Sequence, residues 1–323
     1  MNALRPNWIL EEISAFERSL ALRTAIEMGI FTHIGRGLNT ARALAEVVEA
    51  SERGVSSLCD YLTVQEHLQK RGRRYVLTLN SRIYLSEDSP AYFGSAARFM
   101  ASDEYVRALC ELRSTVRRGR ARSPGENWVS YAQCMAPLAA DVADFVGQSF
   151  GRGDRPIQIL DVAAGHGLYG IAVGMRNSQS HVYACDSTPV LRIARRNARK
   201  AGLTSRYHLL PGDLRRTNLA GPYDLIIAAN VAHHLTEQEN VQLFRKCYTA
   251  LKQSGQVVLI DFVVHPDRVE PKLDAAFAFH LFATGSQEVY TFKQYRKILK
   301  TAGFQKVALN KGRFGHWMIT ASR

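Results

Sequence analysis

The sequence is poor in cysteine and has no long apolar run. Its 5 cysteines include no Cys-x-x-Cys pair, which argues against a disulfide framework and against a thiolate metal site. No apolar stretch approaches the roughly twenty residues that cross a bilayer, and residues 1–8 lack the apolar core of a signal peptide. Repeats and low-complexity segments are also absent. We therefore expect a cytoplasmic globular protein that has no membrane partner.

The composition is that of an ordinary globular protein with an excess of positive charge. With 323 residues, of which 46% are hydrophobic and 22% charged, two domains are expected. The net charge of +13 would favour a polyanionic partner such as nucleic acid or an acidic protein. Much of this charge lies in residues 113–122 and 192–200, and a solvated surface is the simpler interpretation of both runs. Docking of an acidic carrier protein that bears a tethered substrate is a further hypothesis.

The first part of the chain is typical of helices followed by a hairpin. Apolar residues from Ile13 to Met28 recur at three- and four-residue spacings, Thr40 is a plausible N-cap, and residues 51–69 are expected to form another helix. Residues 73–80 alternate as a strand does. This pattern predicts a winged helix in a domain of residues 1–118. Residues 119–126 are rich in turn formers and are the predicted linker to a second domain, residues 119–323.

The second domain alternates between apolar strands and helical segments. Strands are predicted near residues 157–161, 181–185, 206–210, 224–229, 256–264, 305–310 and 316–321. Such alternation favours a Rossmann-like α/β fold: a mainly parallel, seven-stranded sheet with helices on both faces.

Acidic residues and glycines follow the first strands at the spacing of a nucleoside site. Gly165 and Gly167 lie in the first loop, Asp186 comes about twenty residues after the first strand, and Asp213 follows the third strand. Asp161 would repel a pyrophosphate, but its carboxylate can accept hydrogen bonds from an ammonium group. S-adenosylmethionine carries such a group. The glycine loop alone also fits a structural turn, but together with Asp186 and Asp213 it favours a nucleoside site.

These residues resemble the motifs of a known family. Residues 161–167 (Asp-Val-Ala-Ala-Gly-His-Gly), Asp186, Gly212-Asp213 and residues 230–235 (Asn-Val-Ala-His-His-Leu) are similar to the first four motifs of class I S-adenosylmethionine-dependent methyltransferases. Over nearly its full length, the chain resembles the small-molecule O-methyltransferases, which include plant caffeate-type, hydroxyindole and antibiotic-pathway enzymes. Residues 37–45 and 75–78 and Tyr84-Leu85 resemble the winged-helix dimerisation domain of that branch. The resemblance thus implies a homodimer that methylates a small molecule.

The resemblance also implies the cofactor contacts. Gly165 and Gly167 would line the cofactor, Asp161 would face its aminoacyl end, Asp186 would bind the ribose hydroxyls, and Asp213 with Leu214 would frame the adenine. Ala163 stands where the motif usually has its first glycine. The implied cofactor-binding residues are Asp161, Ala163, Gly165, Gly167, Asp186, Asp213, Leu214 and Asn230.

A hydroxyl acceptor must lose its proton, and histidine is the natural base near neutral pH. The resemblance places His233 in the position of the catalytic base and Asp261 and Glu288 in those of its supporting carboxylates, with no metal. His234 and Leu235 stand where the family usually has an acid and a tryptophan. Helix capping or packing against the cofactor is the alternative interpretation of His233.

Aromatic residues and methionine suggest where the acceptor binds. Trp128, Tyr131 and Met135 lie on one predicted helix, and Phe277 and His280 lie on another. Such side chains suit a flat ring, although the same spacing also fits a buried helix face.

Three other functions remain open from the sequence. The same cofactor site would serve a C- or N-methyltransferase, and a degenerate site would bind cofactor without turnover. A DNA-binding regulator would use the winged helix, but residues 56–69 contain two acids and no arginine, so nucleic acid is not the expected partner.

Overall fold

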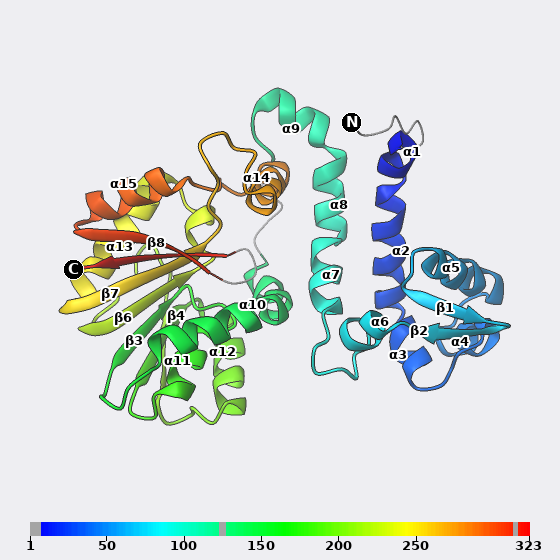
Figure 1. Cartoon of the computed structure of the whole chain (residues 1–323), viewed down its shortest axis with the longest axis horizontal. Coiled ribbons are helices and arrows are strands. Elements are labelled where there is room, and N and C mark those ends of the chain that lie inside the picture. Colours follow the sequence, from blue (N-terminus) through cyan, green and yellow to red (C-terminus); the bar gives the residue numbers. More distant parts are fainter. Residues whose placement is uncertain (1–7, 123–126, 313–315) are drawn as a thin grey trace. The chain divides into compact units, whose positions relative to one another are not determined.

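The computed structural model describes residues 8–122, 127–312 and 316–323 (Figure 1). The chain divides into two compact units, Met1–Asp103 and Glu104–Arg323. This division precedes the predicted boundary after residue 118, because the segment before the linker packs on the second unit: the ring of Tyr105 stacks on that of His280 with centroids 5.4 Å apart. Residues 123–126 of the predicted linker lie outside the described residues.

The first unit consists of short helices and a two-stranded hairpin. Its elements are α1 (Trp8–Ile13), α2 (Ala15–Glu27), α3 (Ile30–Gly35), α4 (Ala41–Val47), α5 (Glu52–Val64), β1 (Leu68–Arg71), β2 (Arg74–Leu77), α6 (Leu79–Tyr84) and α7 (Gly94–Met100). The Thr40 hydroxyl caps α4 by accepting a hydrogen bond from Ala43 N–H. The core of this unit contains Phe31, Leu44, Leu62 and Tyr75, all of which are buried.

Two predictions for this unit were wrong in detail. The helix expected between Ile13 and Met28 is divided at Ser14 into α1 and α2. The helix expected over residues 51–69 ends at Val64, because Glu66 has a left-handed φ of 61° that a helix cannot accommodate. The chain then returns as β1, which pairs antiparallel with β2 to make the predicted wing.

The second unit is the predicted mixed α/β domain. Its elements are α8 (Asp103–Cys110), α9 (Leu112–Arg118), α10 (Trp128–Phe150), β3 (Gln158–Val162), α11 (Leu168–Arg176), β4 (His181–Asp186), α12 (Thr188–Lys200), β5 (Tyr207–Pro211), β6 (Tyr223–Ala229), the 3₁₀ turn η1 (Ala232–His234), α13 (Glu237–Ala250), β7 (Leu251–Asp261), α14 (Lys272–Thr284), α15 (Phe292–Ala302), β8 (Lys306–Lys311) and β9 (Trp317–Ser322). All seven predicted strands are present, although β7 begins and ends earlier than the predicted 256–264.

The seven strands form one sheet in the order β5-β4-β3-β6-β7-β9-β8. Strands β3 to β7 run parallel, whereas β9 is antiparallel to both β7 and β8. The strand order reverses beside β3, and ligands of such sheets bind beyond the carboxyl ends of the strands at this point. A ligand is therefore expected at the loops that follow β3, β4, β5 and β6.

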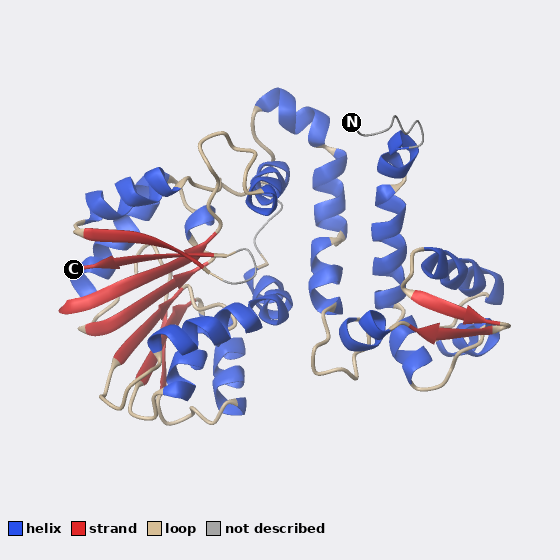
Figure 2. Ribbon diagram, viewed as in Figure 1, coloured by secondary structure: helices blue, strands red, loops and turns tan. Residues whose placement is uncertain are grey.

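Helices cover both faces of the sheet, as predicted (Figure 2). Alternate strand residues point to opposite faces, so Leu160 and Ile226 pack in one apolar cluster with residues of α13 and α15. Ile159 and Ile227 pack in the other, with residues of α10, α11 and α12. Both clusters are buried and hold the strand ends in place. Within the residues that the structure describes, no helix has the length and apolar character to cross a bilayer.

Candidate functional site

The loop between β3 and α11 has a backbone suited to close approach. Ala163, Gly165 and Gly167 all have left-handed φ values, of 54°, 56° and 77°. Asp161, at the end of β3, is only 1% exposed, and its Oδ2 accepts a hydrogen bond from Gly170 N–H at 2.9 Å. Burial raises the pKa of this carboxyl group to about 7, although the Gly170 hydrogen bond opposes the shift. Asp161 therefore joins the strand to the first turn of α11.

Asp186 holds the same loop from the neighbouring strand. Its Oδ2 accepts from Gly165 N–H at 2.9 Å and its Oδ1 from Ser187 N–H at 2.7 Å. Burial raises the pKa of Asp186, and these backbone hydrogen bonds oppose that shift. The carboxylate thus connects the end of β4 to the middle of the glycine loop.

His166 has a role in this loop that the sequence did not reveal. Its side chain is buried, and its Nδ1 accepts a hydrogen bond from Leu168 N–H, one of the donors at the start of α11 that have no partner within the helix. Burial lowers the pKa of His166 to about 4, so the ring is neutral near pH 7 and can act as this acceptor. The position of His166 two residues before α11 was the one sequence signal for this role as a helix cap.

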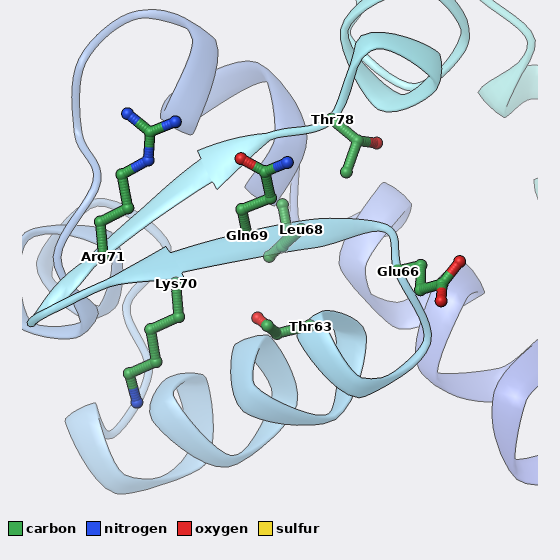
Figure 3. A pocket seen from close by; sticks show the side chains of 7 residues that line it. All are labelled: Thr63, Glu66, Leu68, Gln69, Lys70, Arg71 and Thr78. Atoms are coloured by element: carbon green, nitrogen blue, oxygen red, sulfur yellow. The ribbon is translucent and has the colours of Figure 1, made fainter.

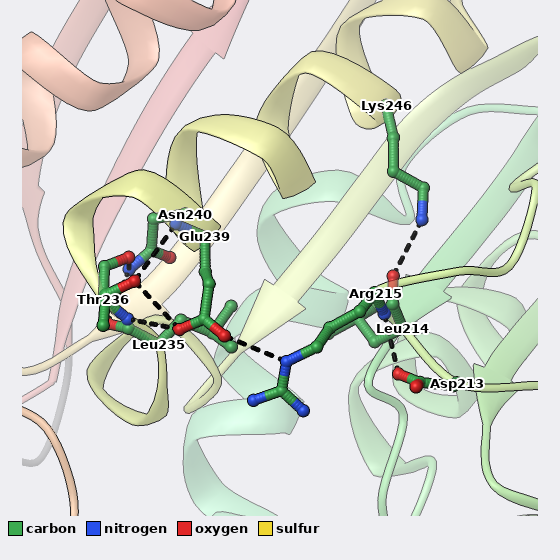
Figure 4. A network of polar contacts seen from close by, with 8 residues as sticks. All are labelled: Asp213, Leu214, Arg215, Leu235, Thr236, Glu239, Asn240 and Lys246. Carbon is green, nitrogen blue, oxygen red and sulfur yellow. Dashed lines mark hydrogen bonds and ion pairs between the residues drawn. The ribbon is translucent and has the colours of Figure 1, made fainter.

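The loop after β5 is tied to α13 by a polar network (Figure 4). Asp213 is exposed, and its Oδ1 accepts from Arg215 N–H. The partly buried Leu214 packs against the sheet core while its carbonyl accepts from Lys246 Nζ at 2.8 Å. The guanidinium of Arg215 pairs with Glu239 at 2.9 Å. The Asp213–Leu214 segment is therefore held at the carboxyl end of β5 by side chains of α13.

The turn η1, which carries the two histidines, is fixed from behind. The fully buried Asn240 donates from Nδ2 to the carbonyls of Ala232 and Leu235, and the Tyr290 hydroxyl donates to Leu235 at 2.6 Å. Thr236 begins α13 with a capping box that involves Glu239. The sequence pattern did not indicate Asn240, although the Thr-x-x-Glu spacing at residues 236–239 is a signal for the helix that carries it.

The structure brings His233 and Asp261 together, as expected. Nδ1 of His233 lies 2.6 Å from Oδ1 of Asp261, and the side chains are 1% and 0% exposed. Asp261 Oδ1 also accepts from Phe262 N–H at 2.8 Å, which holds the acid in place. Nε2 of His233 is buried without a hydrogen-bond partner among the described residues. This nitrogen is available to a ligand.

The structure does not bring Glu288 to His233. The Glu288 side chain is 47% exposed, and its carboxylate pairs with Arg268 at 3.2 Å. Its neighbour along the loop, Ser286, approaches the pair of histidines instead, with Oγ 3.0 Å from Nδ1 of His234. The expected role of Glu288 as a supporting carboxylate must therefore be withdrawn, because its side chain points to an exposed cation.

Aromatic rings surround the histidines. Phe277 stacks on Phe262, with centroids 4.0 Å apart, and meets the ring of His233 edge-on at 5.2 Å. His280 lies 6.0 Å from Phe277 and also stacks on Tyr105. Of the predicted pocket residues of α14, Phe277 therefore adjoins His233, and His280 adjoins Phe277.

The rings of α10 adjoin the second histidine. Trp128 and Tyr131 meet the ring of His234 edge-on at 5.0 and 5.8 Å. Met135 is partly buried one turn further along α10. The α10 and α14 residues predicted to line the pocket thus belong to a single unit, and four of them make ring contacts within it.

The first unit has a cleft of its own, shown in Figure 3. Its volume is about 620 Å³, and it is lined by Thr63, Glu66, Leu68, Gln69, Lys70, Arg71 and Thr78. None of the site residues predicted from the sequence lines this cleft, because all of them belong to the second unit.

The arrangement in the second unit fits a nucleoside with an activated methyl group. A Cβ added at Gly165 would meet only one atom within 4 Å, the Ala163 carbonyl oxygen at 3.9 Å, so a ligand has space to approach this backbone. Asn230 has a φ of 51° and donates from Nδ2 to the Tyr169 hydroxyl at 3.1 Å, but its buried Oδ1 has no described partner. Together with the sheet order, these features define a class I methyltransferase.

Comparisons with known proteins identify the family. Residues 154–305 match the model of an O-methyltransferase domain, and residues 10–87 match that of an O-methyltransferase dimerisation domain. A solved structure from Nostoc punctiforme PCC 73102, of a protein assigned as an O-methyltransferase, is 32% identical with a TM-score of 0.91 and is matched over 100% of both chains. The chain belongs to the S-adenosylmethionine-dependent O-methyltransferase family, and S-adenosylmethionine is its cofactor.

Two further relatives bear on the fold and the chemistry. Human N-acetylserotonin methyltransferase, solved in complex with S-adenosylmethionine, has a TM-score of 0.87 at 21% identity, over 100% of this chain and 99% of that one. The L-tyrosine C(3)-methyltransferase of Streptomyces lavendulae is 26% identical over 163 residues, which are 50% of this chain. That match spans 44% of the relative, less than half of its length.

Proposed function

We propose that His233 is the general base of this enzyme and that the acceptor is a hydroxyl of a small aromatic or polyketide-like molecule. The buried His233–Asp261 pair, with Nε2 left for a ligand, is the observation that carries this proposal. Asp261 accepts a hydrogen bond from Nδ1–H of His233, which fixes the tautomer and leaves the lone pair of Nε2 for the acceptor hydroxyl. Asp261 also stabilises the imidazolium that forms when the hydroxyl proton moves to Nε2. No metal enters this scheme.

The remaining cofactor residues have separate roles in the proposal. When bound, S-adenosylmethionine supplies an electrophilic methyl group next to the base. Asp161 faces the aminoacyl end, Asp186 binds the ribose, and Asp213 and Leu214 frame the adenine. The Ala163–Gly167 backbone and Asn230 line the same space. Each position agrees with the location of these residues at the ends of β3, β4, β5 and β6.

The acceptor lies against the rings around the histidines. Phe277 and His280 form one wall and Trp128 and Tyr131 the other, with Met135 further along α10. Flat aromatic rings favour offset or edge-on contact with such walls. This supports an aromatic acceptor, and the human relative is likewise named for an aromatic hydroxyl compound, N-acetylserotonin.

The first unit is proposed to form a homodimer. The match of residues 10–87 to a dimerisation domain supports this assembly over nucleic-acid binding by the wing. Sedimentation velocity would test it, because a monomer at micromolar concentration would contradict the proposal. A cytoplasmic location and docking of an acidic carrier protein remain predictions, and only the arginine runs at 113–122 and 192–200 support the carrier.

The proposal for His233 is tested by replacing it with glutamine. His233→Gln keeps a polar side chain of similar length but removes the base, so kcat with a phenolic acceptor should fall about a hundredfold or more. Calorimetric affinity for S-adenosylhomocysteine serves as the control for folding and should change less than about threefold. A kcat close to that of the natural enzyme would overturn the role of His233 as base.

A C-methyltransferase is the second candidate, and the similarity to a tyrosine C(3)-methyltransferase favours it. Activation of a ring carbon also requires deprotonation of the phenol, so the His233–Asp261 pair would suit it as well. Two-dimensional NMR of the product decides between them: a methyl carbon bonded to oxygen supports the first proposal, and one bonded to a ring carbon supports the second.

A further inference from the structure

His234 is held as firmly as the base beside it. Its ring centroid lies 4.2 Å from that of His233, and its Nδ1 lies 3.0 Å from Ser286 Oγ. The edges and faces of Trp128 and Tyr131 enclose the ring from α10. Apart from the adjacent His233, these contacts come from two segments that are far from His234 in the sequence, α10 and the loop that carries Ser286. The orientation of His234 is therefore fixed before any ligand binds.

Two neighbouring imidazoles each leave one nitrogen without a partner. Nε2 of His233 and Nε2 of His234 are both buried, and neither has a hydrogen-bond partner among the residues that the structure describes. Buried polar atoms without partners are rare in folded proteins, because the lost hydrogen bonds to water are not replaced. The reacting hydroxyl would be the partner of His233 Nε2. His234 Nε2 would need a second polar group on the same ligand.

We propose, on the basis of the function proposed above, that His234 Nε2 binds a second oxygen of the acceptor, next to the oxygen that is methylated. The acceptor is then an aromatic ring with hydroxyls on two neighbouring carbons. His234 acts as a specificity-determining residue, while His233 remains the base. The ring centroids of the two histidines are 4.2 Å apart, a spacing that favours two oxygens on neighbouring positions of one small molecule.

A vicinal diol satisfies either tautomer of His234. If the Ser286 hydroxyl donates to Nδ1, Nε2 carries the proton and donates to the second oxygen. If Nδ1 donates to Ser286, Nε2 accepts from the second hydroxyl. A hydroxyl can both donate and accept, so it fits both cases. Burial and the neighbouring His233 lower the pKa of His234, which agrees with a neutral ring that has one donor and one acceptor nitrogen.

The test compares 2,3-dihydroxynaphthalene with 2-naphthol, two rings of the same shape that differ in the second hydroxyl. A site that hydrogen-bonds a substrate hydroxyl discriminates strongly against the analogue that lacks it. We expect the natural enzyme to prefer the diol in kcat/KM by about tenfold or more. His234→Phe, which retains a ring but no nitrogen, should reduce this preference to about twofold or less, mainly through the KM of the diol.

Two further variants separate binding from packing. His234→Gln places an amide nitrogen near the position of Nε2 and should retain most of the preference, whereas His234→Asn, which reaches only the position of Nδ1, should lose it. Ser286→Ala leaves the ring in place and should lower the preference severalfold, which keeps the test open if His234→Phe fails to fold.

Each outcome has one meaning. Equal turnover of the two naphthalenes by the natural enzyme, or a preference that survives in both His234→Phe and His234→Asn, overturns this inference and leaves the proposed function intact. Binding of S-adenosylhomocysteine without turnover of either compound overturns the proposed phenolic acceptor and this inference with it.

Discussion

Nδ1 of His233 lies 2.6 Å from Oδ1 of Asp261, and both side chains are almost completely buried. Because Phe262 N–H donates to the same carboxylate oxygen, the acid does not depend on the histidine for its position. Asn240 and Tyr290 hold the turn that carries His233 through its backbone carbonyls. His233 and Asp261 are therefore set in place separately, from two elements of the fold. Such pre-organisation is what proton transfer in a short-lived transition state requires.

Replacement of Asp261 by asparagine should leave the fold intact and reduce turnover. The amide oxygen can still accept from Phe262 N–H, but the charge that stabilises the His233 imidazolium is lost. We expect kcat to fall by about a hundredfold or more, with the affinity for S-adenosylhomocysteine nearly unchanged. Steady-state kinetics and calorimetry measure the two quantities. A fall in kcat of less than about threefold would show that the pair is structural.

Gly167→Ala should be far more damaging than a matched glycine substitution elsewhere. Gly167 and Gly202 have similar left-handed φ values, 77° and 74°, so alanine costs about 1–2 kcal/mol of backbone strain at either position. At Gly202 a new Cβ meets nothing within 4 Å, whereas at Gly167 it would overlap the Tyr207 hydroxyl and approach Ala194 Cβ at 3.0 Å. Urea unfolding should show an additional loss of about 1–3 kcal/mol for Gly167→Ala. Equal losses for the two variants would contradict the close packing of this loop.

Asp186→Asn should weaken cofactor binding through the loop as well as through the proposed contact with the ribose. Both carboxylate oxygens accept backbone hydrogen bonds, from Gly165 and Ser187, and an amide group offers only one acceptor. One N–H would then face the amide NH₂, at a cost of about 1–3 kcal/mol if it stays unpaired. We expect calorimetry to show at least about a tenfold loss of affinity for S-adenosylhomocysteine. The exposed Asp213, changed to asparagine, provides the comparison and should show a smaller loss.

The sequence predicted the sheet well, because strand periodicity is a local signal, and the acids spaced after the predicted strands lie at or just beyond the strand ends. Strands β3 to β6 lie within about a residue of their predicted positions. The path of the loop between α14 and α15 was not predictable in this way. In this loop Ser286 contacts His234 and Glu288 pairs with Arg268, and both contacts are tertiary. Motif spacing alone could not show that Ser286, and not Glu288, lies next to the two histidines.

The sequence pattern indicated neither the end of α5 nor the hydrogen bond of the His166 ring. The helix pattern continues past Val64, but a left-handed residue at Glu66 and the pairing of β1 with β2 terminate it. Likewise, nothing in the pattern shows that the His166 ring turns back to Leu168 N–H. Ala163 stands where the motif usually has its first glycine, and the alanine has a left-handed φ of 54°, a conformation that glycine favours.

The stability of the cofactor-free protein should depend on pH through His166. Burial lowers the pKa of His166 from 6.5 to about 4. Between pH 6.5 and pH 4, His166 binds a proton in the unfolded chain but stays neutral in the folded chain. The contribution of His166 to the free energy of unfolding is therefore complete above pH 6.5 and is lost as the pH falls toward 4. His166→Asn keeps an acceptor for Leu168 N–H but does not titrate. In urea unfolding at pH 7.5 and pH 5, the variant should therefore become more stable relative to the natural protein at the lower pH.

The effect of pH on stability through Asp161 should have the opposite sign to that through His166, so Asp161 serves as the control for that experiment. Burial raises the pKa of its carboxyl group from 3.8 to about 7, so the folded chain holds a proton that the unfolded chain releases. This contribution is complete below pH 3.8 and is lost as the pH rises through about 7. Asp161→Asn should therefore gain stability relative to the natural protein between pH 5 and pH 7.5, the reverse of His166→Asn. Parallel shifts in the two variants would contradict the opposite pKa shifts of His166 and Asp161.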